Sequence, residues 1–243
     1  MSGEATARLM SPRSVVDTVP PAIPLPARPT SSRWSGSAYV FVRPGSGRAS
    51  LAAGGELGGS QAAARLSYRL NAGEATRTAV VARTYAPLAG KGAEAAVGLD
   101  WYPVAAVPIR VSVERRFDLD GYGRHAWSAY AAGGFYLERL GGRLAVDGYG
   151  QAGVVGAARR DLFVDGALRA GRRLRLGPAT ATVGAGLWGA AQPGVSRLDV
   201  GPRVAVALPV ARTDASLAVE GRFRVAGRAA PGSGVAVTLA TQF

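Results

Sequence analysis

The chain has 243 residues, of which 48% are hydrophobic, 19% are charged and only 7% are aromatic. This length predicts one domain plus a tail. The 34 glycines and 15 prolines argue against a helical bundle, because both residue types are costly inside helices. With no cysteine and one histidine, the sequence excludes a disulfide scaffold, a cysteine zinc site and histidine-rich metal sites, and we expect no metal or cofactor.

The formal net charge of +13 comes almost entirely from arginine, since Lys91 is the only lysine. The arginines recur about every eight residues instead of clustering beside stacking aromatics, so we expect no nucleic-acid partner. The sequence has no run of about 20 strongly apolar residues that could form a membrane helix. The first residues also lack the apolar stretch of a signal peptide, so export would require an upstream start or a longer parent chain.

Residues 1–32 differ from the rest of the chain in their high proline content and in the absence of a repeating apolar face. This composition predicts a disordered proline-rich tail or linker. The domain then comprises residues 33–243.

From residue 33 onward, polar and apolar residues alternate in segments of about ten residues, separated by Gly, Pro, Asp or Asn. Leu217, Val219 and Phe223 share one face of such a segment, and Glu220 and Arg222 share the other. The pattern predicts twelve strands, over residues 36–43, 65–70, 76–86, 94–101, 109–116, 126–136, 143–154, 161–169, 180–189, 197–208, 215–225 and 234–243. An even number returns the chain to the side where it began, as closed up-and-down membrane barrels require.

The polar faces distinguish a membrane barrel from a soluble one, because they mix arginine with Asp and Glu and include many small residues. Opposite charges on neighbouring strands can pair inside a lumen, and strands of about 9 to 11 residues suit a tilted crossing of the hydrocarbon layer. We therefore predict an all-β, closed antiparallel up-and-down transmembrane barrel of about twelve strands. The charged residues predicted to face its lumen are Arg65, Arg69, Arg83, Glu94, Asp100, Arg110, Glu114, Asp199, Arg203, Glu220, Arg222 and Arg224.

The last segment, GVAVTLATQF, places Val235, Val237, Leu239 and Phe243 on one face and ends on the aromatic. This pattern is typical of the terminal strand by which outer-membrane barrels are recognised for assembly, so we expect the barrel assembly machinery as a partner. Several aromatics lie near segment ends, the depth at which interfacial girdles form. They are Trp34, Tyr85, Trp101, Tyr102, Trp127, Tyr136 and Trp188.

Several stretches resemble the C-terminal barrel region of bacteriophage adsorption protein A, which is in turn similar to barrels of bacterial exopolysaccharide export proteins. They include RWSGSAYVFVRPGS (33–46), LGGSQAAARLSYRL (57–70), GLDWYP (98–103), RRDLFVDGA (159–167) and WGAAQPGVSRLDVGP (188–202). The resemblance implies an outer-membrane barrel that serves as a phage receptor or polysaccharide conduit. The chain lacks the tetratricopeptide repeats expected upstream, and the resemblance transfers no catalytic residue.

Three motifs have weak functional interpretations. The G-x-G-x-x-G at 148–153 lies in an alternating segment, so small strand residues are favoured over a dinucleotide site. His125 and Ser128 do not share a face if Ser128 faces lipid, so we expect His125 in a loop and no enzyme. Asp118 and Asp120 lack a full calcium ligand set and predict a solvated turn.

The sequence leaves three hypotheses for the function. The first, implied by the resemblance together with the charged lumen, is a non-enzymatic outer-membrane barrel in phage adsorption or exopolysaccharide export, with lipid and lipopolysaccharide as partners. The second is a narrow arginine-lined diffusion pore, and the third a soluble basic β-domain that binds polyanions. Arginines in outward loops could contact lipopolysaccharide phosphates, with Arg172, Arg173 and Arg175 at the other side. These loop arginines are Arg48, Arg124, Arg159, Arg160 and Arg228.

Overall fold

The computed structural model describes residues 32–45, 47, 50–53, 57–71, 77–104, 107–139, 141–157, 160–210 and 213–243. The predicted tail therefore lies outside the described residues, apart from Ser32. The strands are β1 (Trp34–Val42), β2 (Gln61–Arg69), β3 (Arg77–Pro87), β4 (Glu94–Tyr102), β5 (Ile109–Asp118), β6 (Ala126–Arg139), β7 (Leu144–Val155), β8 (Asp161–Leu176), β9 (Ala179–Gln192), β10 (Val195–Val210), β11 (Thr213–Gly227) and β12 (Gly234–Gln242). Within these ranges, no helix is long and apolar enough to cross a membrane.

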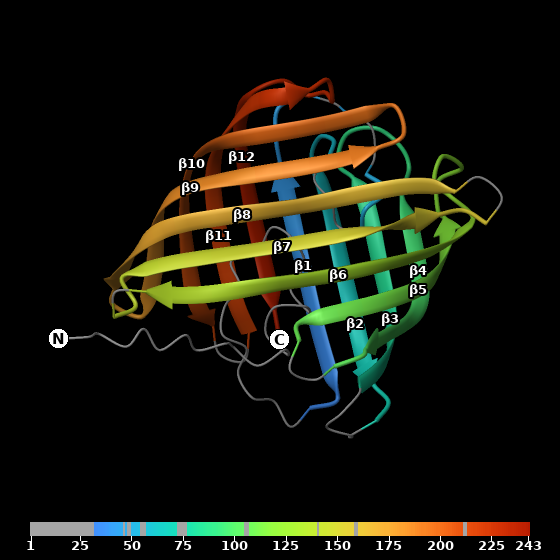
Figure 1. Cartoon of the computed structure of the whole chain (residues 1–243), viewed down its shortest axis with the longest axis horizontal. Helices are drawn as coiled ribbons and strands as arrows, with labels where there is room; N and C mark the ends of the chain where they lie inside the picture. The colour runs from blue at the N-terminus through green and yellow to red at the C-terminus, as the bar shows by residue number, and fades with distance from the viewer. Residues whose placement is uncertain are drawn as a thin grey trace.

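The twelve strands form one closed antiparallel barrel, in which each strand pairs with its neighbours in sequence and β1 pairs with β12. Closure places Tyr39 opposite Ala240 and Phe41 opposite Thr238. The strands are steeply tilted, so β6 to β10 in front cross β1 to β3 behind them at a large angle (Figure 1). The predicted fold class is confirmed. Closure leaves no free sheet edge, as a spanning β-structure requires.

The barrel is apolar on the outside and charged on the inside. Val219, Phe223 and Leu239 are 45%, 56% and 55% exposed, whereas Arg203 and Arg222 are buried, with only 4% and 0% of their surface exposed. This distribution is the reverse of that in a soluble β-barrel, whose apolar side chains fill the centre. It follows from the period-two alternation, because successive strand residues point to opposite faces.

The two ends of the barrel differ in their connections. The loop end carries residues 43–60, 88–93, 119–125, 156–160, 193–194 and 228–233. The terminal end carries Trp34, Gln242 and the other five connections, two of which have only two residues. At one of these, the β8–β9 turn, Gly177 adopts a φ of 63°, a conformation that favours glycine, directly before Pro178.

Strand length divides the barrel into two walls. The short-strand wall, β12 and β1 to β5, has strands of 9 to 11 residues, and the long-strand wall, β6 to β11, has strands of 12 to 16. The sequence predicted five of the six long strands too short and predicted β7 at its full length of 12 residues, displaced by one residue. For example, the strand predicted over 161–169 continues to Leu176, because Arg172, Arg173 and Arg175 extend β8 at the terminal end. Consecutive arginines obscured the alternation there.

Candidate functional site

Glu114 is the centre of an ion-pair cluster inside the short-strand wall. Arg83 donates from both Nε, at 2.8 Å, and Nη2 to the Glu114 carboxylate. The Ser128 hydroxyl donates to the same carboxylate at 3.0 Å, and Arg116 Nε lies 3.4 Å from it. Glu114 is fully buried, so these partners replace its hydration. Arg83 on β3 reaches β5 past the intervening β4, which ties three strands together.

Asp100 is the centre of a second cluster in the same wall. Arg65 forms an ion pair with Asp100 Oδ2, and Ser112 Oγ donates to Oδ1 at 2.6 Å. Arg110 Nε lies 3.9 Å from the carboxylate. Arg65 on β2 thereby also reaches past one strand, to β4.

In the long-strand wall, Glu220 holds two buried arginines. Arg203 Nε donates to Oε1 at 2.9 Å, and Arg222 Nε donates to Oε2 at 2.9 Å. The guanidinium carbon of Arg222 lies 4.2 Å from the centre of the Trp188 ring and 5.2 Å from that of Phe41. An arginine over aromatic faces gains cation–π stabilisation, which is larger away from water.

Asp199 connects the two walls near the loop end. Arg197 binds it with two hydrogen bonds, of 2.9 and 3.0 Å, and Arg43, directly after β1, donates to it at 3.2 Å. Deeper in the long-strand wall, Arg169 Nε donates to Asp147 at 2.6 Å. The two parallel bonds from Arg197 to Asp199 form a bidentate pair, which is stronger and more directional than a single hydrogen bond.

Cations and anions in the interior nearly balance. Among the described residues, eight arginines and seven carboxylates are buried. Isolated buried charges would be very costly, whereas paired charges satisfy one another. Most of the chain's positive excess therefore lies outside this interior network.

The β1–β2 connection enters the barrel at the loop end. Leu51 and Ala52 are buried against Tyr130, Val155 and Phe163, all from the inner face. We call the described residues 50–53 and 57 the plug segment. The plug segment forms no strand, and its residues Leu51 and Ala52 pack inside the barrel.

Side chains from both walls bind the backbone of the plug segment. Arg116 Nη2 donates to the Leu51 carbonyl at 2.9 Å, and Gln192 Oε1 accepts from the Leu51 N–H at 2.7 Å. Gln151 Nε2 donates to the Ala53 carbonyl at 2.9 Å, and Arg197 Nη1 donates to the Leu57 carbonyl at 3.3 Å. Buried loop backbone needs such partners. These bonds fix the plug segment inside the lumen.

The structure places most of the predicted lumen residues inside the barrel. Buried are Arg83, Glu94, Asp100, Arg110, Glu114, Asp199, Arg203, Glu220 and Arg222. Arg65 and Arg69 are partly buried, and Arg69 donates to the Ser32 carbonyl at the terminal end. Arg224 lies opposite Asp199 in the register but is exposed at the loop end, where it donates to the Ala229 carbonyl at 2.7 Å.

Sequence reasoning missed several interior residues. Asp147, Asp165 and Arg169 are buried, but they lie in glycine- and alanine-rich strands whose alternation is weak. Arg43 was the last residue of the strand predicted over 36–43, and its parity with the buried Tyr39 and Phe41 could have placed it inside, although β1 itself ends at Val42. Gln151 was missed for another reason. It binds the Ala53 carbonyl of the plug segment, and the sequence does not show where that distant loop folds.

The predicted aromatic girdle is only partly correct. Trp34, Trp101 and Trp127 are exposed on the outside. The other four aromatics are buried on the inside, where their long side chains fill the lumen: Tyr85, Tyr102, Tyr136 and Trp188. Position near a strand end does not determine the face, whereas parity along the strand does.

The structure gives the residues of the weak motifs positions in loops and strands, with no catalytic arrangement among the described residues. His125 is exposed just before β6, as predicted, but Ser128 faces the interior, not lipid, where it binds Glu114. The glycines of 148–153 lie within β7. Arg124 pairs with Asp161 at 2.8 Å, and Arg160 and Arg228 are exposed, whereas Arg48 and Arg159 lie outside the described residues.

The acidic turn of the β5–β6 connection is held by backbone hydrogen bonds. Asp118 Oδ1 accepts from the N–H groups of Asp120, Gly121 and Gly123 at 2.8 to 3.0 Å. Asp120 Oδ2 accepts from Gly92 at 2.7 Å and from Ala93 at 3.1 Å, which lowers the Asp120 pKa below its ordinary value. In the described part of the chain, no group of three or more acidic or histidine side chains is placed to hold a metal ion.

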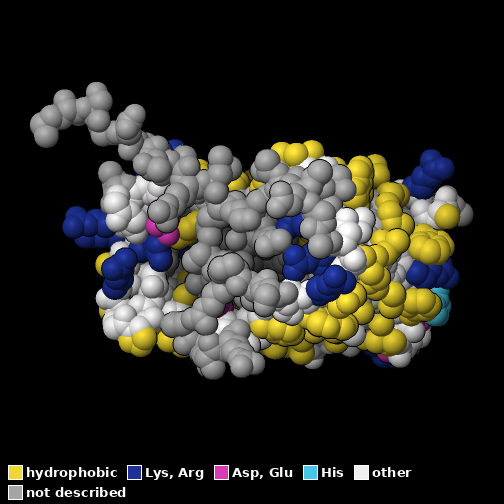
Figure 2. Space-filling view, turned by 90° about the horizontal axis from the view of Figure 1, so that it is seen from below, with side chains coloured by type: hydrophobic (Ala, Val, Ile, Leu, Met, Phe, Trp, Pro, Cys, Tyr) yellow, Lys and Arg dark blue, Asp and Glu magenta, His cyan; other side chains and the backbone are white. Residues whose placement is uncertain are grey.

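In Figure 2, hydrophobic side chains gather on the lower and right-hand parts of the visible face, and Lys and Arg side chains project at its left and right margins. The C-terminal residues belong to the apolar outside of the barrel: Val235, Leu239 and Phe243 are exposed, and Val237 is partly buried. The Phe243 ring lies against Gly36 of β1, where a Cβ would come within 2.4 Å of it. The last residue therefore packs across the closure of the barrel.

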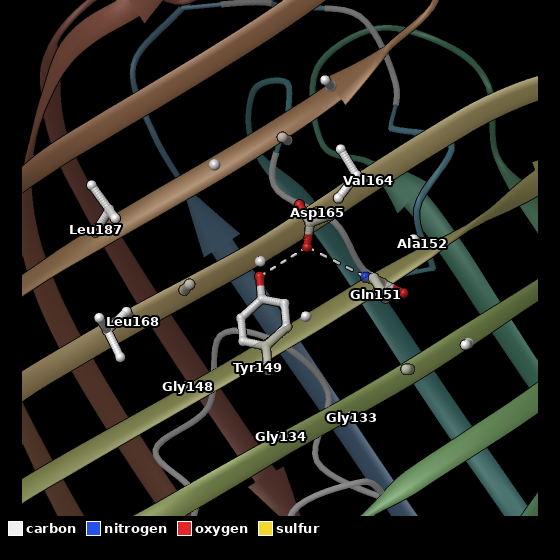
Figure 3. A pocket seen from close by; sticks show the side chains of 18 of the residues that line it. Gly133, Gly134, Gly148, Tyr149, Gln151, Ala152, Val164, Asp165, Leu168 and Leu187 are labelled. Carbon is white, nitrogen blue, oxygen red and sulfur yellow. Dashed lines mark hydrogen bonds between the residues drawn. The ribbon is translucent and has the colours of Figure 1, made fainter.

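The long-strand wall has an unusually thin region. Gly133, Gly150, Gly166 and Gly189 lie directly opposite one another on four adjacent strands. They line a hollow of about 1110 Å³ whose surroundings include Val164, Leu168 and Leu187 on the outer face. Figure 3 shows this region with β1 behind it, and the dashed lines mark the hydrogen bonds that Tyr149 and Gln151 donate to Asp165, at 2.9 and 3.3 Å.

Together these features define the class: a closed twelve-stranded antiparallel barrel with an apolar exterior and an ion-paired interior. The chain is similar to the crystal structure of an outer-membrane channel from Pseudomonas putida F1, with a TM-score of 0.50, 14% identity, and 89% of this chain and 96% of that one covered. At 14% identity, this similarity shows a shared fold and does not show a shared function.

Two further barrels were found at lower similarity. The β-domain of the Bordetella autotransporter BrkA has a TM-score of 0.39 and 13% identity, covering 86% of this chain and 97% of that one. Wzi, an Escherichia coli outer-membrane protein involved in group 1 capsule assembly, has a TM-score of 0.31 and 9% identity, covering 76% and 51%. No family model and no curated protein sequence matches the chain.

Proposed function

We propose that the chain spans a bacterial outer membrane, with its terminal end in the periplasm and its loop end at the cell surface. The support is the apolar outer face combined with strands of 9 to 16 residues, which are long enough to cross the hydrocarbon layer when tilted. Lipid and lipopolysaccharide would surround the barrel. Val235, Val237, Leu239 and Phe243 would form the signal read by the assembly machinery.

The proposed role is non-enzymatic: a cell-surface receptor or passage element in phage adsorption or exopolysaccharide export. The observation that favours the receptor form of this role is the plug segment, bonded at its backbone to side chains of both walls. A fixed plug gives the loop end a defined surface that a partner can recognise, as a receptor requires. The resemblance of residues 33–243 to the phage adsorption barrel supports the same role.

The test is deletion of the gene, followed by measurement of phage adsorption and of secreted polysaccharide. We expect at least one to fall and to recover with the wild-type gene. No change in either would overturn the role. Separately, membrane fractionation and heat-modifiable gel mobility test location and closure, with Phe243→Ala expected to reduce the assembled fraction.

An arginine-lined diffusion pore is the second candidate, favoured by the number of interior arginines. The geometry weakens it, because the buried arginines are bonded to nearly as many carboxylates, which leaves little net field to attract anions. Conductance measured in planar bilayers distinguishes the two. Frequent anion-selective steps from the wild-type protein would favour the pore, and rare or absent steps the plugged receptor.

A further inference from the structure

The loop end holds a small polar cavity beside the plug segment. Its volume is about 240 Å³, and residues of four different loop-end connections contribute to its lining, together with the adjoining ends of three strands. Its polar side chains include Lys91, Glu94, Tyr122, Arg124 and Asp161. A cavity of this size suits one small unit of a ligand rather than a drug-sized molecule.

The charges around this cavity cancel. Lys91 and Arg124 contribute two cations, and Glu94 and Asp161 contribute two carboxylates. Arg124 Nη1 is held 2.8 Å from Asp161 Oδ2, and Glu94 lies 3.6 Å from Arg116 Nη1. Of the two cations, Arg124 already has a carboxylate partner and the Lys91 ammonium lies over the Tyr122 ring, so a free anion would have to compete with both contacts. A neutral ligand whose groups both donate and accept hydrogen bonds matches this lining better.

The lining also offers an exposed aromatic ring. Tyr122 is 64% exposed, and the Lys91 ammonium lies 3.9 Å from the centre of its ring, so the side chain is braced without being buried. An aromatic side chain supplies a rigid, amphipathic surface with a hydroxyl at its tip. A ligand with an apolar flat face and polar edges can use both properties.

The walls of the cavity are ordered in advance. The Asp120 carboxylate accepts from the backbone of Gly92 and Ala93 and so ties the β3–β4 connection to the β5–β6 connection. On the opposite side, Gln192 is fixed by its hydrogen bond from Leu51 of the plug segment. A preorganised cavity loses less entropy on binding, which favours recognition of a small ligand.

We propose that this cavity binds a neutral sugar unit of a surface or secreted polysaccharide. A sugar ring carries hydroxyls that donate and accept, together with an apolar C–H face that can lie against Tyr122. The cell-surface placement of the cavity rests on the proposed function, whereas its chemistry rests on the lining residues alone. The inference therefore names the ligand class of the loop end.

The test is saturation-transfer NMR on the purified full chain in lauryldimethylamine oxide, a detergent without a sugar headgroup. The probes are D-glucose, D-galactose and D-mannose. We expect transfer to at least one hexose, and Tyr122→Ala and Asp161→Asn each to weaken it about fivefold, the effect of one lost hydrogen bond of about 1 kcal/mol. Leu119→Ala, in the same connection but outside the lining, should leave it unchanged.

Three results would overturn the sugar site: no transfer to any of the hexoses, transfer that survives both lining substitutions, or displacement of the sugar by inorganic phosphate at equal concentration. Heat-modifiable mobility of each variant checks that the barrel is closed. Because the assay uses purified protein, it is independent of the deletion experiment. Hexose binding with unchanged phage adsorption and polysaccharide would retain the site and reject the receptor role.

Discussion

The two walls stabilise buried arginines in different ways. In the short-strand wall, Arg65 and Arg83 each reach past an intervening strand to Asp100 and Glu114. In the long-strand wall, Arg222 and Arg197 pair with carboxylates two residues away on the same strand, Glu220 and Asp199. The other buried arginines of this wall, Arg203 and Arg169, reach only to the adjacent strand. The first arrangement clamps several strands together, whereas the second neutralises charge locally.

The difference follows from what surrounds the arginines. Trp188 and Phe41 lie beside Arg222 and occupy interior space, so its guanidinium stays near its own strand. The long strands also carry the glycine row and the hollow, where the wall is thin. We infer that the short-strand wall depends more on ion pairs between strands, and the long-strand wall more on backbone pairing over its greater strand length.

The largest effect is expected from removing the central carboxylate of each wall. Glu114→Gln leaves Arg83 and Arg116 without their shared anion, and Glu220→Gln does the same to Arg203 and Arg222. Each change should cost about 3 to 5 kcal/mol, because an uncompensated buried charge remains. No described residue contacts both Glu114 and Glu220. The losses in the free energy of unfolding should therefore add in the double variant.

Unfolding in guanidinium from detergent micelles, followed by tryptophan fluorescence, measures these losses. Glu138→Gln is the control, since Glu138 pairs with Arg173 at the terminal end in a partly exposed position. Glu138→Gln should lower the free energy of unfolding by about 1 kcal/mol or less. Strongly non-additive losses in the double variant would show that the two walls form one electrostatic network.

The next effect concerns wall thickness. At Gly98 in the short-strand wall, a Cβ would lie 2.3 Å from the Val113 carbonyl oxygen and 2.6 Å from Glu114 Cβ. At Gly150 in the long-strand wall, it would meet nothing within 4 Å. Gly98→Ala should therefore destabilise the barrel by about 1 to 3 kcal/mol through overpacking, and Gly150→Ala should have little effect. The temperature of the heat-modifiable mobility shift compares the two variants, and equal shifts would contradict the thin-wall description.

The accuracy of the sequence analysis also differs between the walls. For β3 to β5, alternation placed Arg83, Asp100 and Glu114 on the inner face, because these strands contain few glycines and a strict period of two. In β7 and β8 the inner positions also hold apolar residues, such as Ala145, Phe163 and Ala167, so Asp147 and Arg169 did not stand out as part of a polar face. A face of mixed polarity gives only a weak alternation signal.

The plug segment and the sugar cavity could not be predicted from the sequence. Both bring together residues distant in sequence, such as Leu51 with Gln192, and local pattern holds no information on such pairings. Their positions follow only after closure has fixed which connections share the loop end. The C-terminal alternation, in contrast, was sufficient to place Leu239 and Phe243 outside.

A smaller effect is expected from loosening the plug segment from the long-strand wall. Gln151→Ala with Gln192→Ala removes two of the bonds to its backbone but leaves the Arg116 and Arg197 bonds. At about 1 kcal/mol each, the population with the plug released should rise roughly 30-fold. The chain contains no cysteine, so Ala52→Cys, at a position 5% exposed, provides a specific probe.

A membrane-impermeant maleimide should label Ala52→Cys slowly in the otherwise wild-type barrel and faster in the triple variant. A cysteine at exposed Leu119 gives the reference rate for an open position. Equal, fast labelling of Ala52→Cys in both backgrounds would mean that the plug segment does not close the lumen in solution. The receptor role would then lose its main support.

The smallest effect is a pH dependence at the loop end of the short-strand wall. The Asp120 pKa is lowered by hydrogen bonds from Ala93 and Gly92, so its contribution is present above the unfolded pKa and is lost as the pH falls through the lower folded value. Hydrogen exchange at the two amides, corrected for intrinsic rates, should therefore accelerate in acid while β4 stays protected. Asp120→Asn should remove this pH dependence. If the amides keep their protection in acid, the connection between the two loops does not depend on the carboxylate, and the preorganisation of the sugar cavity must come from the strands beneath it.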